Sequence, residues 1–189
     1  MAKLRTFICF ELPVHVIETL AELQESLRPL SGGVRWTRPK GIHLTLKFLG
    51  DVDEESLPAV AQAVKVAASS TSAFDIQVIG AGAFPNIKRP RVFWVGVSEP
   101  SGELQRLQER IETALQPLGF ERETRKFSPH LTIGRVKFAD HLKRITDFFE
   151  TEPLAPVSFS ADELVIMKSE LKPGGAVYTP LHTIQLKPS

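Results

Sequence analysis

The sequence has little of several features that assign a chain quickly to a functional class. It contains one cysteine, Cys9, in the apolar run from Phe7 to Phe10, so no intrachain disulfide can form and the thiol is expected to be buried. Lys and Arg exceed Asp and Glu by one (23 against 22), so the chain lacks the overall positive charge that by itself would indicate nucleic-acid binding. Any anion-binding site must therefore be local.

Long apolar runs are also missing. No stretch approaches the ~20 apolar residues of a membrane-spanning helix. The first residues, Met1 to Arg5, lead directly into a strand-like segment rather than into the apolar region of an export signal. Together with the single cysteine, this favours a cytoplasmic protein. With 42% hydrophobic residues in 189, the chain can bury the core of one large domain or of two small lobes.

What the sequence does contain is a short pattern that occurs twice. His-Leu-Thr-Leu at 43–46 returns 87 positions later (130 minus 43) as His-Leu-Thr-Ile at 130–133. The match extends upstream to an Arg-x-Thr-Arg segment, at 35–38 and at 122–125, so that six of eleven positions agree. This favours an internal duplication over chance, with a period too long for a solenoid repeat.

Each copy of the pattern is expected to lie on a β-strand. Because side chains alternate between the two faces of a strand, His43 and Thr45 share one face, and the second motif repeats this arrangement. The same alternation predicts Lys47 on the face of His43 and Phe48 on the opposite, buried face with the leucines. Polar side chains aligned in this way are suited to a ligand.

If the two motifs converge, their side chains form a set suited to phosphodiester chemistry. Two imidazoles with ordinary pKa values near ~6.5 can take and give a proton, and two hydroxyls can donate to an anionic oxygen. Hydrolysis needs a base for water, an acid for the leaving alkoxide and donors for the phosphate oxygens. No metal is required, and His-x-Thr is a poor metal-ligand pattern, so no metal and no cofactor are expected. His15, His141 and His182 lack such a partner and are interpreted as surface or packing residues.

Hydrophobic periodicity predicts an α+β protein. The predicted strands are 4–11, 42–49, 74–79, 92–97, 130–136, 163–168 and 177–186, and the predicted helices are 14–27, 54–68, 103–115 and 139–149. No Ser-rich or Pro-rich linker divides the chain. We therefore expect residues 1–189 to form a single compact domain of two similar interleaved lobes, with the motif strands facing each other across a cleft.

Several of these segments resemble a known family. The paired motifs, the start at 5–13, the Gly-Ala-Phe-Pro segment at 82–85 and the Ser-Pro dipeptide before His130 are similar to the 2H phosphoesterase superfamily. More narrowly, the chain resembles the bacterial and archaeal RNA 2',3'-cyclic phosphodiesterases, also called 2'-5' RNA ligases. The likeness covers nearly the whole chain. It implies a bilobal, pseudo-twofold α+β fold in which two antiparallel sheets line a central cleft and the helices lie outside.

The resemblance also implies an activity and roles for individual residues. The expected reaction is metal-independent hydrolysis of a 2',3'-cyclic phosphate, on RNA ends or small cyclic nucleotides, to a 2'-phosphomonoester. In the reverse sense, the family joins RNA ends through a 2'-5' linkage without ATP. Carried over by position, His43 is the proton donor, His130 is the proton acceptor, and Thr45 and Thr132 bind the phosphate. The two motifs are so alike that the residues alone do not say which histidine is the acid.

Arg135 matches a basic residue that the family often has just after the second motif. Strict alternation puts it on the face opposite His130, so it reaches a phosphate only if Gly134 permits a bulge or the strand ends there. Otherwise it is a solvated arginine at the end of a strand. Other candidates for contacts to an RNA backbone are the cations near the motifs: Arg35, Arg38, Lys40, Lys47, Arg122, Arg125 and Lys126. Trp36, Phe48 and Phe127 are candidates for base stacking, and each suits the core equally well.

Two other functions use the same residues. One is a non-catalytic module that binds RNA ends or nucleotides, with the histidines as hydrogen-bond donors. The other is ligation as the physiological direction of the reaction. No membrane and no protein partner are implied, and a monomer is expected.

Overall fold

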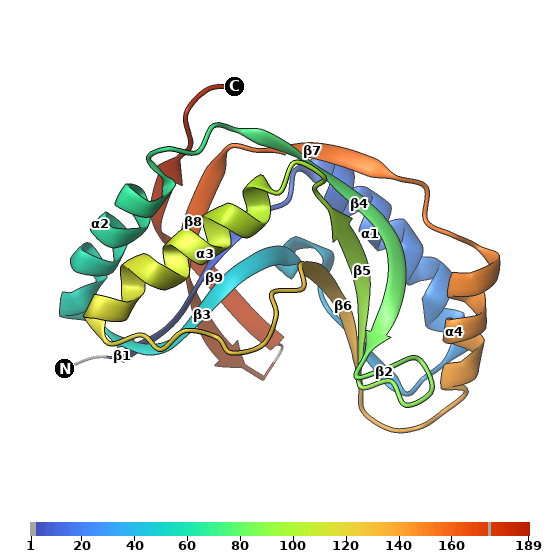
Figure 1. Cartoon of the computed structure of the whole chain (residues 1–189). Coiled ribbons are helices and arrows are strands. Elements are labelled where there is room, and N and C mark those ends of the chain that lie inside the picture. The colour runs from blue at the N-terminus through green and yellow to red at the C-terminus, as the bar shows by residue number, and fades with distance from the viewer. Residues whose placement is uncertain (1–2, 174) are drawn as a thin grey trace.

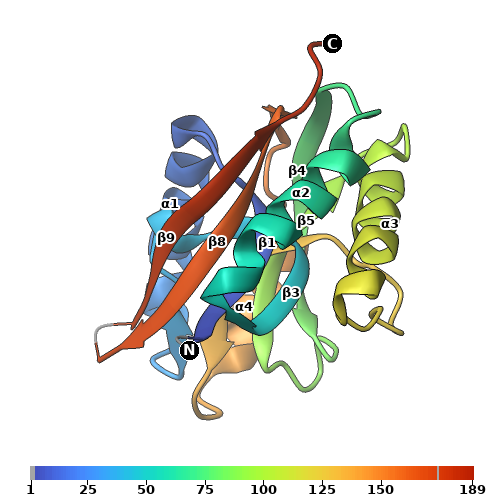
Figure 2. The same cartoon turned by 90° about the vertical axis from the view of Figure 1, so that its left-hand side faces the viewer.

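The computed structural model describes residues 3–173 and 175–189 and contains two antiparallel β-sheets with helices on their outer sides (Figure 1). Sheet A has the strand order β3-β1-β8-β9, and sheet B has the order β2-β6-β5-β4-β7. Helices α2 and α3 cover the outer side of sheet A, and α1 and α4 cover that of sheet B. Figure 2, seen from the outer side of sheet A, shows α2 in front of that sheet. The predicted fold class is confirmed.

The strands are β1 (Lys3–Glu11), β2 (Val34–Trp36), β3 (His43–Asp53), β4 (Phe74–Phe84), β5 (Val92–Ser98), β6 (His130–Val136), β7 (Val157–Ala161), β8 (Glu163–Lys172) and β9 (Gly175–Gln185). The helices are α1 (Val14–Leu27), α2 (Leu57–Ala68), α3 (Glu103–Leu115) and α4 (Leu142–Thr151), and the short 3-10 helices are η1 (Arg28–Leu30), η2 (Pro39–Gly41), η3 (Glu54–Ser56) and η4 (Gln116–Leu118). In the part of the chain that these bounds cover, no helix is long and apolar enough to cross a membrane.

Each predicted element is present, whereas β2 and β7 were not predicted and β4 extends beyond its predicted end. The missed strands have 3 and 5 residues, which is too short for a clear periodicity. The predicted strand ends at residue 79, just before Gly80 of β4. Gly80 has a φ of 71° and lies in a bulge between Val78 and Ala81, where the pairing with β5 shifts register. The strand continues beyond it to Phe84.

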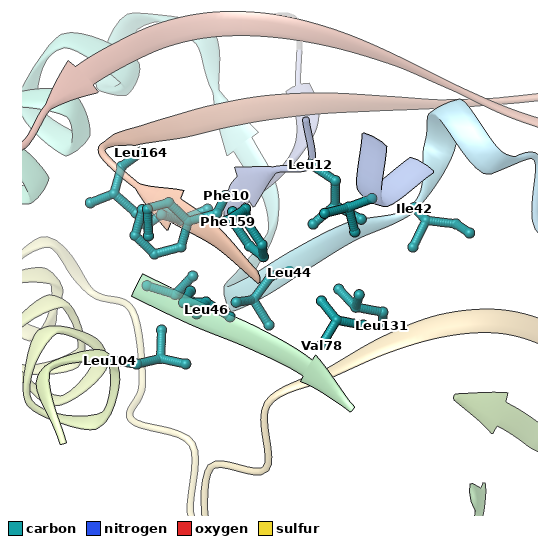
Figure 3. Close-up of a cluster of buried hydrophobic side chains, with 14 of the residues drawn as sticks. Phe10, Leu12, Ile42, Leu44, Leu46, Val78, Leu104, Leu131, Phe159 and Leu164 are labelled. Carbon is teal, nitrogen blue, oxygen red and sulfur yellow. The ribbon is translucent and has the colours of Figure 1, made fainter. Parts of the chain in front are cut away.

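One hydrophobic core runs through both sheets (Figure 3). Leu44 and Leu46 of β3 and Leu131 of β6 point into it, close to Val78 of β4, and Leu44 and Leu131 are fully buried. Because these alternate residues are inside, the histidine and threonine of each motif face the other side of their strands. The core therefore fixes the orientation of both motifs.

The two motif strands lie side by side although they belong to different sheets. Gln24 of α1, which is fully buried, ties them together. Its Nε2 donates to the carbonyl oxygens of Thr37 and Ile133, each at 2.8 Å, and the Thr37 N–H also donates to Ile133 at 2.9 Å. The segment that leads into the first motif is thus bonded directly to the strand of the second.

A buried ion pair makes the reciprocal connection. Lys47 of β3 donates through Nζ to Glu112 Oε2 of α3 at 2.6 Å and to the carbonyl oxygen of Glu121 at 2.8 Å. The Glu112 carboxylate also accepts from Gln108 Nε2 at 3.1 Å and from the Glu123 N–H at 3.3 Å. The segment that leads into the second motif is therefore held to the strand of the first.

We predict that Lys47→Ala lowers the free energy of unfolding by about 3 to 5 kcal/mol, because it leaves the buried Glu112 carboxylate without its counter-charge. Urea unfolding monitored by circular dichroism measures this change. The exposed Lys65 of α2 provides the control, and Lys65→Ala is expected to change stability by no more than about 0.5 kcal/mol. Equal effects of the two substitutions would show that the pair does not hold the segment.

Candidate active site

The first motif strand carries a β-bulge just after its His-x-Thr segment. In the pairing of β1 with β3, Leu46 is an extra residue, and a bulge of this kind reverses the alternation beyond it. The expected faces of Lys47 and Phe48 are therefore wrong. Lys47 is buried with the leucines, whereas Phe48 is 68% exposed. The Phe48 ring lies 5.8 Å from that of Phe7, which itself stacks on His43, so Phe48 is on the histidine face.

The second motif strand has a bulge at the equivalent place. Ile133 is the extra residue in the pairing of β6 with β5. Gly134 is buried, and a Cβ there would lie 2.8 Å from Val34 Cγ1 and 3.0 Å from the Trp36 ring, so any other residue would have to displace these side chains. Beyond the bulge, Arg135 is exposed on the face of His130. The bulge that Arg135 needs in order to lie on the same face as His130 is therefore present.

His43 is enclosed by aromatic rings. The Phe7 ring stacks on it with a centroid distance of 4.5 Å and an interplanar angle of 26°, and Tyr178 of β9 meets it edge-on at 4.9 Å. Burial lowers the pKa of His43 to about 4, and a hydrogen bond to the backbone of Gly41 partly offsets this effect. In the free protein at neutral pH, His43 is therefore an uncharged imidazole.

His130 lies in a similar but more open setting. Its Nδ1 is 2.7 Å from the carbonyl oxygen of Ser128. A carbonyl oxygen only accepts hydrogen bonds, so Nδ1 carries the hydrogen and Nε2 of the neutral ring keeps a free lone pair. The Phe84 ring supports the imidazole edge-on at 4.8 Å. Each catalytic candidate is thus bonded to the backbone of the residue two positions before it.

The two threonines supply hydroxyl groups next to the histidines. Thr45 and Thr132 are both half-buried, each two residues beyond its histidine and on the same face. Within residues 3–173 and 175–189, neither hydroxyl takes part in a hydrogen bond of the protein, so both can donate to a ligand. The prediction that each strand offers an imidazole and a hydroxyl side by side agrees with this geometry.

Tyr178 connects the two sides of the site. Burial raises the pKa of its phenol, and the positive charges of Arg135 and Arg5 oppose that rise. Arg135 belongs to sheet B, whereas Tyr178 belongs to sheet A and contacts His43. The charge of Arg135 in one sheet therefore acts on a phenol of the other sheet. Phe7 and Phe84 lie in segments that resemble the family, and Tyr178 does not, but no role in the site was predicted for any of the three.

The upstream halves of the repeat occupy different structures. Arg35 lies on β2, directly opposite Arg135 of β6. Arg122 lies in the irregular segment after α3, where Nη1 is 3.5 Å from Thr113 Oγ1 and the side chain lines a cavity of about 520 Å³ between α2 and α3. Neither histidine lines this cavity. Of the two equivalent arginines, only Arg35 is brought towards the site.

The remaining histidines lie elsewhere. His15 is exposed, with Nε2 2.9 Å from the carbonyl oxygen of Ser158, and His141 is exposed at the start of α4. His182 is half-buried on β9. Among the residues that the structure describes, no three His, Cys, Asp or Glu side chains gather into a group that could hold a metal ion.

Comparisons with known proteins agree with these features. A family model described as the 2'-5' RNA ligase superfamily matches residues 12–173. The RNA 2',3'-cyclic phosphodiesterase of Methanothermobacter thermautotrophicus is 31% identical over 185 residues, which span 97% of this chain and 100% of that protein. The protein of the same name from Thermotoga maritima is 34% identical over 184 residues, 97% of this chain and 96% of that protein. The crystal structure of TT0787 from Thermus thermophilus superposes with a TM-score of 0.80 at 29% identity, covering 97% of this chain and 98% of that one.

We predict that His43 titrates with a pKa of about 4 in the free protein, as measured by the pH dependence of its ring protons in NMR spectra. Phe7→Ala is expected to raise this pKa towards ~6.5, because it admits water to one face of the ring. Phe138→Ala, at a position that is 58% exposed, is the matched control and leaves it unchanged. An ordinary pKa for His43 in the unaltered protein would contradict the prediction.

The same depressed pKa gives an expected loss of stability in acid. The ring protonates near pH ~6.5 in the unfolded chain but only near pH 4 in the folded one, so the unfolded state binds more protons between these values. The free energy of unfolding therefore falls as the pH is lowered through this window, and His43 accounts for roughly 2.5 kcal/mol of the fall between pH 7 and pH 4.5. Chemical unfolding at pH 7 and pH 4.5 measures it, and His43→Gln should remove that part of the dependence.

Proposed function

Because the chain belongs to the 2'-5' RNA ligase superfamily, we propose that it is an RNA 2',3'-cyclic phosphodiesterase that hydrolyses a terminal cyclic phosphate to a 2'-phosphomonoester. The observation that carries the proposal is the paired arrangement of His43 and His130, on adjacent strands of two sheets, each beside a free threonine hydroxyl. The names of the relatives described above support the same activity.

In the proposed mechanism, His130 is the base. Its Nδ1–H is held by the Ser128 carbonyl, so Nε2 can take a proton from a water molecule as the oxygen attacks phosphorus. The bond between phosphorus and the 3'-oxygen breaks, and His43 gives a proton to that oxygen. Thr45 and Thr132 donate to the non-bridging oxygens, where negative charge increases in the transition state.

Arg135 would complete the phosphate site. Its charge already acts on the Tyr178 phenol beside His43, which supports a position within reach of a phosphate bound between the histidines. A guanidinium there neutralises the charge of the diester, and its interaction with the phosphate strengthens as that charge increases.

The low pKa of His43 makes its role as an acid depend on the substrate. A neutral imidazole has no proton to give, but an anion within about 4 to 6 Å raises the pKa of a histidine by about 1 to 3 units. From about 4 in the free protein, such an increase raises the fraction of His43 that carries a proton near neutral pH in the complex. The negative charge of the substrate phosphate thus favours the protonated form of His43, which can then act as the acid.

The same geometry accounts for ligation. If the 5'-hydroxyl of a second RNA strand replaces the attacking water, the same bond to the 3'-oxygen breaks and a 2'-5' linkage forms without ATP. We propose hydrolysis as the main direction because water is in large excess over RNA ends. We further propose that the protein is a cytoplasmic monomer, which size-exclusion chromatography and fractionation of cells test directly.

We predict that the protein converts a 2',3'-cyclic nucleotide to the 2'-phosphate in the presence of excess chelator. His43→Ala and His130→Ala are each expected to lower kcat by about 10² to 10⁴-fold, because each removes a positioned acid or base. His15→Ala, which removes an imidazole bonded to Ser158 outside the site, is the control and should retain activity. Product chromatography distinguishes the two phosphate isomers.

Three results would contradict the proposal. Formation of the 3'-phosphate alone would exclude the bond cleavage described above. Retention of activity in both histidine variants would exclude their roles. Tight, salt-sensitive nucleotide binding without any turnover would favour a non-catalytic binding module that uses the same residues.

We also predict that substrate binding takes up a proton. A 2',3'-cyclic nucleotide carries one charge that does not titrate, and His130→Ala is expected to slow its turnover enough for binding to be measured. Calorimetric titration of His130→Ala at pH 5.5, in buffers of different ionisation enthalpy, should show uptake of up to one proton per nucleotide bound. The double variant with His43→Ala should show none. Binding without proton uptake in His130→Ala would mean that His43 is not charged by the substrate.

A further inference from the structure

Six exposed cations gather at one end of sheet B, which we call the basic end. They are Arg35 of β2, Lys88, Arg89 and Arg91 of the β4–β5 loop, and Arg135 and Lys137 of β6 and the residue after it. Backbone pairing brings them together, since Arg35 and Val92 both lie opposite Arg135, and the Val136 N–H donates to the Arg91 carbonyl at 2.9 Å. Figure 1 shows the β4–β5 loop beside β2 and the end of β6.

The loop that carries three of these cations has a defined shape and starts next to the catalytic candidates. The Asn86 side chain accepts the N–H groups of Lys88 at 3.1 Å and Arg89 at 3.0 Å, which closes the turn from within. At the base of the loop, Phe84 contacts the His130 ring edge-on. The cations therefore continue outward from the site on a structured support.

The basic end also lacks counter-charges. None of its six cations forms an ion pair within the ranges 3–173 and 175–189. Arg35 and Arg135 lie directly opposite each other on neighbouring strands, an arrangement of like charges that destabilises a sheet. A surface that keeps such repulsion in the free protein is suited to a ligand with several negative charges.

The segment before the second motif, 121–126, has a smaller net positive charge than the basic end. It holds three cations, Arg122, Arg125 and Lys126, but also Glu121 and Glu123. Its net charge is therefore +1 (three minus two), compared with +6 for the basic end.

We propose that the basic end binds the backbone phosphates of the RNA strand on the 5' side of the terminal cyclic phosphate. RNA chains are then better substrates than cyclic mononucleotides. Arg135 is the link, because its charge acts on the Tyr178 phenol beside His43 and it lies directly opposite Arg35 of the basic end. The proposal rests on the proposed function, and it adds that the protein recognises several nucleotides of the strand through charge rather than through base identity.

The test compares two charge reversals of identical size. Lys88→Glu with Arg89→Glu alters the basic end, whereas Lys143→Glu with Arg144→Glu alters an exposed Lys-Arg pair on α4. Each changes the net charge by −4, and thermal unfolding checks that both variants remain folded. The probes are a fluorescent RNA hexanucleotide ending in a 2'-phosphate and a nucleoside 2'-phosphate, titrated over a range of KCl concentrations.

For the Lys88/Arg89 variant we expect hexanucleotide affinity to fall about tenfold or more. The slope of log affinity against log salt should shrink by about 0.7 for each RNA phosphate that the variant no longer neutralises. The ratio of kcat/KM for a cyclic-phosphate hexanucleotide to that for a cyclic mononucleotide should fall similarly. The Lys143/Arg144 variant should match the unaltered protein in all three measurements.

Equal decreases in the two variants would overturn the proposal, because they would reflect net charge alone. An unchanged hexanucleotide affinity for the Lys88/Arg89 variant would also overturn it. So would a Lys88/Arg89 variant that binds vesicles of anionic phospholipid more weakly than the unaltered protein does but binds RNA equally well. Failure of the proposed function is separate: the unaltered protein would then cleave neither substrate, while the binding titrations would still decide whether the basic end holds RNA.

Discussion

The fold depends on the packing of two leucine-bearing strands from different sheets into one core. Leu44 and Leu46 of β3 and Leu131 of β6 are buried in the same cluster, and this burial turns the polar side chains of both motifs outward on adjacent strands. Gln24 and Lys47 add specificity to this contact. Gln24 bonds the segment before the first motif to the strand of the second motif. Lys47, on the strand of the first motif, bonds to α3 and to the segment before the second motif. The candidate catalytic groups are therefore held by the core itself rather than by loops.

The sequence was sufficient to predict the class of fold, the principal elements and the two motifs, because these depend on local periodicity and on repeated residue types. The faces of Lys47 and Phe48 were predicted wrongly, since alternation has no means of showing a bulge that is defined by pairing with a distant strand. In the second copy, Gly134 indicated a possible bulge, whereas Leu46 and Lys47 in the first copy do not indicate one. The family resemblance is confirmed by the matching family model and the relatives.

The aromatic surroundings of the site could not be predicted for a similar reason. Phe7, Phe84 and Tyr178 come from three strands that are far apart in the chain, and nothing in the local pattern of any of them indicates contact with a histidine. The upstream part of the repeat suggested equivalent positions for two arginines that the structure places differently. Arg35 and Arg122 have the same offset from a histidine, but only Arg35 lies in a strand, because the second copy is preceded by the segment that Glu112 holds against β3.

The matching bulges have a further consequence for how a ligand is oriented. Two equal half-sites would accept a phosphodiester in either of two opposite directions, and each histidine would act as acid in half of the encounters. The fifth position after each histidine differs between the copies, because it holds an exposed aromatic ring in one strand and an exposed cation in the other. In the proposed mechanism, these unlike residues would help to orient the bound strand, and its direction would set which histidine gives the proton and which receives it.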